Sequence, residues 1–372
     1  MTSELSSLCS YAKGKVSVDT LSNRNYVSTE NMVPNKGGIV DAGALPSAQY
    51  TQQYIKDDIL VSNIRPYFKK IWMADDDGGC SNDVLVFRAE CGCDSTFLYY
   101  VLANDAFFNY ASATSKGTKM PRGDKTAIMQ YEVPCFNHET QLRIGKLLRS
   151  IDDRITVNKK INDNLADLLQ TIYQGRFGND ILAVNQGVLS DICSYSTDKV
   201  AVSELNVRTY FSTENMLSGK AGSTEATSLP TTSQTTACHK GDTLISNIRP
   251  YFKKIVYCED KCGCSTDVLC FTPSQPCYSA YLFSTLYADK FFAFMVAGSK
   301  GTKMPRGDKQ QIMTYPVVLP SEEELAGFNT IASPLLEQIY SNRAENKRLS
   351  ILRDTLLPKL MSGEINVSAI QL

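Results

Sequence analysis

Histidine is scarce in this sequence, with only His138 and His239 among 372 residues. The two do not occupy corresponding positions of the internal repeat described below, which excludes a histidine-based active site present in both copies. The sequence also lacks the motifs G-x-x-x-x-G-K-[ST], G-x-G-x-x-G, H-E-x-x-H and G-x-S-x-G, which bind phosphates or metals or carry a nucleophile. We therefore predict that the chain is not an enzyme.

Excess charge and long apolar runs are also missing. There are 38 Lys and Arg against 39 Asp and Glu, so any anion-binding surface must be local. The strongest apolar stretch, "AYLFSTLYADKFFAFMVA", is interrupted by Asp289 and Lys290, which are costly in a bilayer. The N-terminal "MTSELSSLCSYAKGK" does not read as a signal peptide. These features predict a cytoplasmic protein with no membrane partner.

The twelve cysteines lack a regular spacing. Only three pairs recur in both copies of the repeat, Cys9 with Cys193, Cys80 with Cys264 and Cys93 with Cys277. A metal site through Cys258, Cys262 and Cys264 is conceivable in one copy, but the usual paired C-x-x-C spacing is missing. We expect reduced cysteines that pack in the interior and no bound metal.

The chain contains an internal repeat with a constant offset of 184 positions. "SNIRPYFKKI" begins at Ser62 and again at Ser246, and "SKGTKMPRGDK" begins at Ser115 and again at Ser299. "YVSTENM" in the first copy corresponds to "YFSTENM" in the second. Identical segments of this length predict two copies of one unit of about 185 residues, each with its own core.

Each copy changes character along its length. Short apolar runs such as "DDILVSNIR", "FKKIWMA" and "NDVLVFR", with the turn "DDDGG" between them, predict strands. Ser95 and Ser279 are expected to cap one helix each, and a long helix should follow. The predicted order is a globular domain (1–137), a long helix (138–185), a second globular domain (186–320) and a second long helix (321–372).

Both long helices carry a heptad pattern, which predicts that they pair. Position a holds Ile144, Ile151, Asn158, Leu165 and Ile172 in the first helix and Phe328, Leu335, Asn342, Leu349 and Leu356 in the second. Position d would then hold Leu147, Arg154, Ile161 and Leu168, and Ile331, Gln338, Glu345 and Leu352. An asparagine at the same a position of each copy is typical of helices held in one register. Ordinary amphipathic surface helices are the alternative.

The predicted fold class is therefore α+β, with two pseudo-symmetric globular α/β domains separated by two long helices that form an antiparallel coiled coil. Helices of about 30 to 35 residues would place the two domains at opposite ends of a rod. In the second helix, the capping box "SEEE" at Ser321 should open a short helix, and Ser333 and Pro334 should start a new one. His138 is expected near the start of the first long helix.

The identical segments of each copy are small cationic loops on a nearly neutral protein. Their Lys and Arg side chains could bind phosphates, and Asn, Arg or Thr could contact base edges. The alternative for any one residue is a structural role, with Arg65 or Arg122 paired to a carboxylate such as Asp58 or Asp83. The predicted nucleic-acid-binding residues are Asn63, Arg65, Tyr67, Lys69, Lys70, Lys116, Thr118, Lys119, Arg122 and Lys125, and Asn247, Arg249, Tyr251, Lys253, Lys254, Lys300, Thr302, Lys303, Arg306 and Lys309.

This arrangement resembles the specificity subunit of a type I restriction-modification system over nearly the whole chain. The resemblance is carried by "KDDILVSNIRPYFKKI" and "KGDTLISNIRPYFKKI", by both "GTKMPRGDK" loops, and by the closing "LLPKLMSGEI" from Leu356 to Ile365. The first long helix ends with "TIYQGRFGND" instead, so its terminal contacts should differ.

The resemblance implies a non-catalytic reader of double-stranded DNA. Each globular domain would be a target-recognition domain for one half of a bipartite target, and the paired helices would set the spacing and dock two methyltransferase subunits. S-adenosylmethionine would bind those partners and not this chain, which lacks [ND]-P-P-[YF]. Restriction subunits with ATP-driven motors would join the larger complex.

The identical loops further predict two similar half-sites, and hence a nearly palindromic target. The copies differ most at "VPNKGGIVDAGALPSAQYTQQY" and "LSGKAGSTEATSLPTTSQTTAC", where differences in specificity would arise. Two other functions fit the pattern: an adaptor protein whose helices oligomerise, and an RNA-binding module that stacks bases on Tyr67, Phe68, Tyr251 and Phe252.

Overall fold

The computed structural model describes residues 2–178 and 185–367, and the chain divides into two compact units. Unit 1 combines Met1–Val157 with Glu345–Leu372, whereas unit 2 is the continuous stretch Asn158–Ala344. Each unit holds one globular part and half of each long helix, so the units cut across the four predicted ranges, which stay a prediction. Within the described ranges, no helix is long and apolar enough to cross a membrane.

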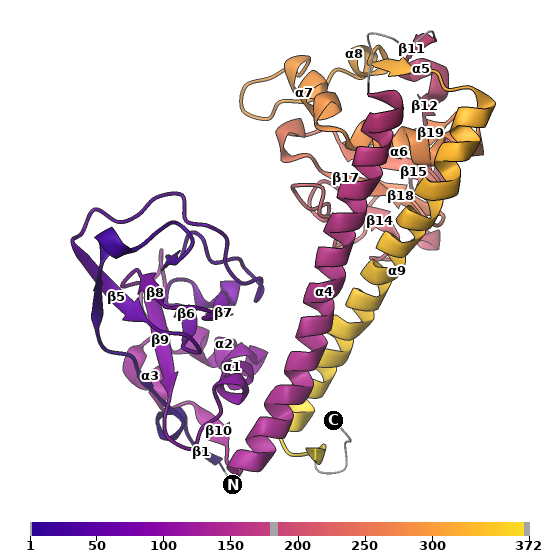
Figure 1. The fold of residues 1–372 in the computed structure, drawn as a ribbon. Coiled ribbons are helices and arrows are strands. Elements are labelled where there is room, and N and C mark those ends of the chain that lie inside the picture. The colour runs from indigo at the N-terminus through magenta and orange to yellow at the C-terminus, as the bar shows by residue number, and fades with distance from the viewer. Residues whose placement is uncertain (1, 179–184, 368–372) are drawn as a thin grey trace. The chain divides into compact units, whose positions relative to one another are not determined.

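The globular part of unit 1, indigo to purple in Figure 1, contains two four-stranded sheets and one two-stranded sheet. Their strand orders are β2-β9-β6-β7, β3-β5-β8-β4 and β1-β10, and the pairing is antiparallel except between β4 and β8. The elements are β1 (Thr2–Glu4), β2 (Cys9–Tyr11), β3 (Lys15–Ser17), β4 (Tyr26–Val27), β5 (Tyr50–Tyr54), β6 (Ile59–Ser62), β7 (Ile71–Met73), β8 (Gly78–Cys80), β9 (Val84–Ala89), α1 (Ser95–Ala103), α2 (Asp105–Ala113), α3 (Lys125–Met129) and β10 (Glu132–Pro134).

The sheet β2-β9-β6-β7 is buried on both faces. Side chains alternate along each strand, so each strand contributes to a core on either side of the sheet. Ile59 and Phe87 point into the main core with α1 and α2, while Leu60 and Val86 join a smaller core with side chains of the second sheet. The apolar runs that predicted these strands are therefore continuous, as expected for strands covered on both sides.

Unit 2 repeats this architecture element by element. Its sheets have the orders β12-β19-β16-β17, β13-β15-β18-β14 and β11-β20. The elements are β11 (Gln186–Val188), α5 (Leu189–Ile192), β12 (Cys193–Tyr195), β13 (Lys199–Ala201), β14 (Tyr210–Phe211), β15 (Gln234–Cys238), β16 (Thr243–Ser246), β17 (Ile255–Tyr257), β18 (Cys262–Cys264), β19 (Val268–Pro273), α6 (Ser279–Tyr287), α7 (Asp289–Ala297), α8 (Lys309–Met313) and β20 (Pro316–Val318). The α+β class predicted from the sequence is confirmed.

The unmatched cysteines replace a tyrosine in the second core. In unit 1 the buried Tyr54 donates a hydrogen bond to the Asn25 carbonyl, and a Cβ on Gly78 would lie only 2.3 Å from the Tyr54 hydroxyl. This close approach explains why position 78 is a glycine, and Gly78 belongs to strand β8 and not to the turn predicted at "DDDGG". Unit 2 has Cys238 at the position of Tyr54, and Cys262 fills the freed space at the position of Gly78.

All twelve cysteines carry free thiols, and four of them, Cys258, Cys262, Cys264 and Cys270, gather around Cys238 in unit 2. The Cys258 and Cys262 sulfur atoms lie 3.6 Å apart. Within residues 2–178 and 185–367, no group of three or more His, Cys, Asp or Glu is arranged to hold a metal ion. The cysteines of this cluster pack as small apolar side chains.

Each predicted core helix is in fact two helices. The break after α1 lies at Asn104, whose extended backbone ends α1 and whose side chain accepts a hydrogen bond from the Ala106 N–H to begin α2. The cap of α1 is Asp94, not Ser95, because its carboxylate accepts from the Phe97 N–H at 2.7 Å. In unit 2 the same break falls at Ala288.

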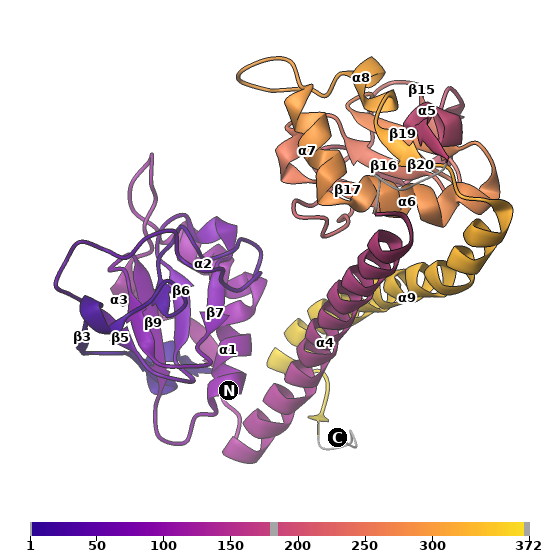
Figure 2. The same ribbon diagram turned by 45° about the horizontal axis from the view of Figure 1, so that its top comes forward.

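The two long helices, α4 (His138–Phe177) and α9 (Glu322–Met361), have 40 residues each, more than predicted. Helix α4 begins at His138 as expected. Ser321 and Glu324 form the predicted capping box, but α9 continues through Pro334 without ending. Figure 2 shows α9 bending in its N-terminal part, as expected where proline removes one backbone hydrogen bond.

Within each unit the two helix segments run antiparallel. In unit 2, Asn342 donates to the Asn162 side-chain oxygen at 2.9 Å, and Phe328 packs edge-to-face against Phe177. In unit 1, Asn346 donates to the Ile155 carbonyl at 3.3 Å. Polar contacts of this kind in an apolar seam favour one register over others.

The predicted seam was half right. Its a positions Ile151, Asn158 and Asn342 are buried, and Leu165, Leu335 and Leu349 are half-buried. The d positions were wrong by one residue, since Ile161, Leu168, Ile331 and Leu352 are exposed. The residues one position after the predicted d positions complete the seam instead. They are Leu148, Ile155, Asn162 and Leu169 in α4 and Ala332, Ile339, Asn346 and Arg353 in α9.

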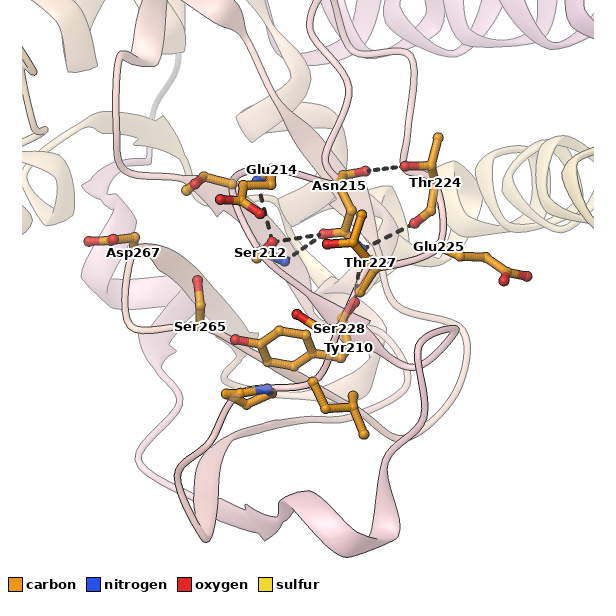
Figure 3. Close-up of a pocket in the computed structure, with 14 residues that line it drawn as sticks. Tyr210, Ser212, Glu214, Asn215, Thr224, Glu225, Thr227, Ser228, Ser265 and Asp267 are labelled. Atoms are coloured by element: carbon orange, nitrogen blue, oxygen red, sulfur yellow. Dashed lines mark hydrogen bonds between the residues drawn. The ribbon is translucent and has the colours of Figure 1, made fainter. Parts of the chain in front are cut away.

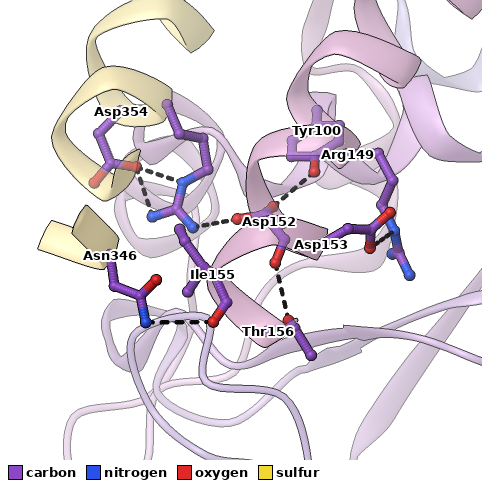
Figure 4. A network of polar contacts seen from close by, with 9 residues as sticks. Tyr100, Arg149, Asp152, Asp153, Ile155, Thr156, Asn346 and Asp354 are labelled. Carbon is purple, nitrogen blue, oxygen red and sulfur yellow. Dashed lines mark hydrogen bonds and ion pairs between the residues drawn. The ribbon is translucent and has the colours of Figure 1, made fainter. Parts of the chain in front are cut away.

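A polar network fixes the helices of unit 1 to its globular part (Figure 4). The Tyr100 hydroxyl of α1 donates to Asp152 of α4 at 2.6 Å, and Arg353 of α9 donates to the other oxygen of the same carboxylate at 2.7 Å. Burial and the neighbouring Asp152 carboxylate raise the pKa of Tyr100. Three elements distant in sequence therefore meet at one carboxylate.

Candidate nucleic-acid interface

The two cationic segments of unit 1 form one continuous surface. The first leaves strand β6 at Ser62, and the second connects α2 to α3. Ile64 and Arg122 form a β-bridge, and the Arg65 N–H donates to the Pro121 carbonyl at 2.8 Å. Segments more than fifty residues apart thus create a single site.

Unit 2 builds the same surface from the identical residues. Ile248 bridges Arg306, and the Arg249 N–H donates to the Pro305 carbonyl at 2.8 Å. The copies have diverged in their cores but not in this geometry.

The first cationic segment has a strained backbone in both units. Arg65 and Lys69 have left-handed backbones with φ of 51° and 50°, and Arg249 and Lys253 have φ of 50° and 51°. Between them a 3-10 turn, Pro66–Phe68 or Pro250–Phe252, exposes two aromatic rings. Left-handed arginine and lysine are uncommon and cost free energy, so a strained conformation present in both copies indicates a functional surface.

The exposed part of the surface is partly apolar. About half of the Tyr67 side chain is exposed, and its ring lies 4.9 Å from that of Phe68. Tyr251 and Phe252 repeat this arrangement at 4.7 Å. The rings are therefore free to stack on a ligand.

Lys69 and Lys253 are partly neutralised by a carboxylate on the following helix. Asp105 pairs with Lys36 and Lys69, both at 2.9 Å, and Asp289 pairs with Lys220 and Lys253. Burial alone would raise the pKa of Asp105, but the hydrogen bonds from its two lysines outweigh burial and hold that pKa below its usual value.

Lys70 and Lys254 are turned inward. The Lys70 ammonium donates to the Thr29 carbonyl, and Lys254 donates to that of Thr213. Burial lowers the pKa of both lysines. Their position ties the first cationic segment to the repeated "STEN" turn.

Arg122 and Arg306 make the structural ion pair that was considered as an alternative. Arg122 lies 2.9 Å from Asp83, and Arg306 lies 3.0 Å from Asp267. Both guanidinium side chains remain more than half exposed, so the ion pair fixes their orientation and still leaves them accessible to a ligand. Asp58 pairs instead with Arg88.

The second segment carries the freest cations. Lys119 and Lys303 are exposed, and neither has an ion-pair partner in the part of the chain that the structure describes. Lys116 and Lys300 each pair with the aspartate that caps the next helix, Asp124 or Asp308. The remaining predicted residues are placed as follows: Asn63 and Asn247 are buried, while Thr118, Lys125, Thr302 and Lys309 are exposed.

A polar pocket of about 330 Å³ adjoins the surface in unit 2 (Figure 3). Tyr210, Ser212 and Asn215 of the segment "YFSTEN" line it, together with the divergent stretch 224–230. Asp267, the partner of Arg306, also lies on its wall. The residues that differ between the copies are thereby held beside the residues that are identical.

Met120 and Met304 were missed in the sequence-based list of site residues. Each lies between Lys119 and Arg122, or between Lys303 and Arg306, and is about half exposed. Their identity in both copies was the available signal, but an apolar residue does not suggest a phosphate contact.

Comparison with known proteins found similarity to one family over part of this chain. Residues 1–166 match the family model described as the type I restriction modification DNA specificity domain. The chain is 26% identical over 159 residues to the EcoDI type I restriction enzyme specificity subunit of Escherichia coli, a match that spans 41% of this chain and 35% of that protein. It is 22% identical over 336 residues to the MjaIX specificity subunit of Methanocaldococcus jannaschii, covering 74% of this chain and 70% of that one.

A solved structure shares the fold. The crystal structure of a type I restriction-modification S subunit from M. genitalium superimposes with a TM-score of 0.59 at 18% identity, covering 97% of this chain and 96% of that one.

Proposed function

We infer that the chain belongs to the family of type I restriction-modification specificity subunits, and from this premise we propose that it reads a bipartite target in double-stranded DNA, one half with each unit. The observation that carries the proposal is the composite cationic and aromatic surface, built twice from identical residues. A nearly neutral protein that concentrates exposed Lys, Arg and aromatic side chains on one surface of each unit has what phosphate and base contacts require.

We further propose that the target is nearly palindromic. Arg122 and Arg306 have the same backbone contacts and the same carboxylate partner, so the two units present equivalent groups to DNA. A map of methylated adenines in the host genome, with and without this chain, tests this. Two similar half-sites in inverted orientation are expected, and two unrelated half-sites would contradict the proposal.

The chain itself is a recognition subunit and not an enzyme. Methylation would be carried out by two methyltransferase subunits that bind S-adenosylmethionine, and restriction subunits would join through them. Exposed apolar side chains on the long helices support docking of such partners, among them Leu168 of α4 and Leu352 of α9.

Charge reversal of Lys119 and Lys303 tests the surface itself. Because both are exposed and unpaired within the described chain, Lys119→Glu and Lys303→Glu should leave the fold intact. Each should weaken binding of the complex to its target duplex and lower the slope of log affinity against log salt by about 1. Lys56→Glu, three residues before the start of strand β6 and so beyond the end of the strand that lies away from the surface, is the matched control. Unchanged affinity in both lysine variants would remove the second segment from the interface.

A further inference from the structure

The tip of the second cationic segment carries an exposed methionine in each unit. Met120 and Met304 are 50% and 49% exposed. A single exposed apolar residue needs no explanation in general. Here it recurs at the same position in both copies. In each copy it lies between an exposed lysine that has no ion-pair partner among the described residues and an arginine held in place by an aspartate.

The segment is a rigid hairpin and not a loose loop. Lys116 and Arg122 exchange two backbone hydrogen bonds of 2.9 Å, and Gly117 has the positive φ that the turn requires. Pro121 accepts from the Arg65 N–H, and the stem packs so closely that a Cβ on Gly123 would lie 2.9 Å from the Asn63 side chain. Both ends of the hairpin are therefore fixed while its tip stays in solvent.

The copy in unit 2 is held by the same contacts. Lys300 and Arg306 exchange hydrogen bonds of 2.9 Å, and Gly307 donates to the Asn247 carbonyl at 3.3 Å. A rigid apolar tip between cations is suited to insertion between two stacked base pairs while its neighbours bind the flanking phosphates.

We propose that Met120 and Met304 are apolar wedges, each of which enters one base step of its half-site, partly unstacks it and kinks the duplex. The inference rests on the proposed DNA-reading function and adds to it that DNA is deformed at two defined points. Insertion makes recognition depend on the deformability of that step, and flexible pyrimidine–purine steps resist a wedge least.

The test measures bending of a duplex of about 40 base pairs that carries the mapped target and a fluorescent dye at each end. The full chain is used in complex with its methyltransferase subunits, and energy transfer between the dyes is compared with that of the free duplex. We expect transfer to rise on binding, Met120→Ala or Met304→Ala to keep about half of the rise, and the double variant to lose it. Affinity should fall about tenfold for each alanine.

Leucine variants are the matched controls because they keep an apolar side chain of similar size. Met120→Leu and Met304→Leu should retain the bend, and thermal unfolding should show that all variants fold. A wild-type complex that binds a straight duplex, or a double alanine variant that binds and bends as the wild type does, overturns the wedge and leaves the reading function standing. Failure of the wild-type complex to bind the duplex overturns both.

Discussion

Single residues hold the interface in an unfavourable conformation. Arg65 and Arg249 precede proline and still adopt a left-handed backbone, although such residues normally avoid this region. Backbone contacts to Pro121 and Pro305 stabilise the conformation. Stability and recognition should therefore respond differently to substitution at these positions.

Glycine and alanine at position 65 separate the two effects. Both Arg65→Gly and Arg65→Ala remove the guanidinium, so both should weaken DNA binding equally. Glycine relieves the backbone strain, so Arg65→Gly should be more stable than Arg65→Ala by about 1 kcal/mol in urea unfolding. Equal stability of the two variants would show that the left-handed conformation is not present in solution.

Glu259 predicts a dependence of stability on pH. Burial, followed by repulsion from Asp260, raises the pKa of Glu259 to about 7, and the fold therefore favours the protonated carboxyl. Its stabilising contribution is complete below the unfolded pKa of about 4.5 and is lost as the pH rises through 7. Melting temperatures recorded from pH 4 to 8 should fall less steeply for Glu259→Gln than for the wild type. Parallel curves would contradict the raised pKa.

Elements of the two units are joined differently at equivalent positions. Unit 1 connects its helices through Asp152 and Arg353, whereas unit 2 has the buried Leu336 and Leu169 at those places. An ion pair that is partly buried stabilises little beyond a leucine pair, but it strongly disfavours the loss of one partner.

Substitution in the network of unit 1 should follow that rule. Asp152→Leu leaves Arg353 and the Tyr100 hydroxyl without their shared acceptor and should lower the free energy of unfolding by about 2 to 3 kcal/mol. Adding Arg353→Leu and Tyr100→Phe should restore most of this loss, which urea unfolding measures. A triple variant no more stable than Asp152→Leu would show that polar contacts cannot be exchanged for packing here.

Local signals in the sequence predicted many elements but not their contacts. The main strands and the capping box follow from neighbouring residues, and the repeat follows from comparing positions 184 apart. The seam was misplaced because Leu168 and Leu352 are apolar but exposed, while the true row contains Asn162 and Arg353. The meeting of Arg65 with Pro121 could not be predicted, since backbone pairing between distant segments has no local signature.

At the scale of the whole molecule, the misassigned residues become candidates for subunit contacts. Leu168 and Leu352 occupy equivalent positions of the repeat and are 47% and 46% exposed. One such side chain per unit matches the proposed docking of two methyltransferase subunits.

Native mass spectrometry can count those subunits. Leu168→Asp or Leu352→Asp should each reduce the bound methyltransferases from two to one, because a carboxylate would be desolvated in the contact. The double variant should bind none, and Ile161→Asp, at an exposed position without an apolar counterpart in the repeat, is the control. Two subunits bound to the double variant would place the docking surface elsewhere.

The discontinuity of unit 1 also bears on how the chain is made. Leu357 and Leu360 belong to the core of unit 1, yet they are synthesised only after all of unit 2. On the ribosome, at about 5 to 20 residues per second, the domain that emerges first must wait about 10 to 40 seconds for its last core side chains. Unit 2 is therefore the first to have its whole core synthesised, and unit 1 can complete its core only after Leu357 and Leu360 have been made.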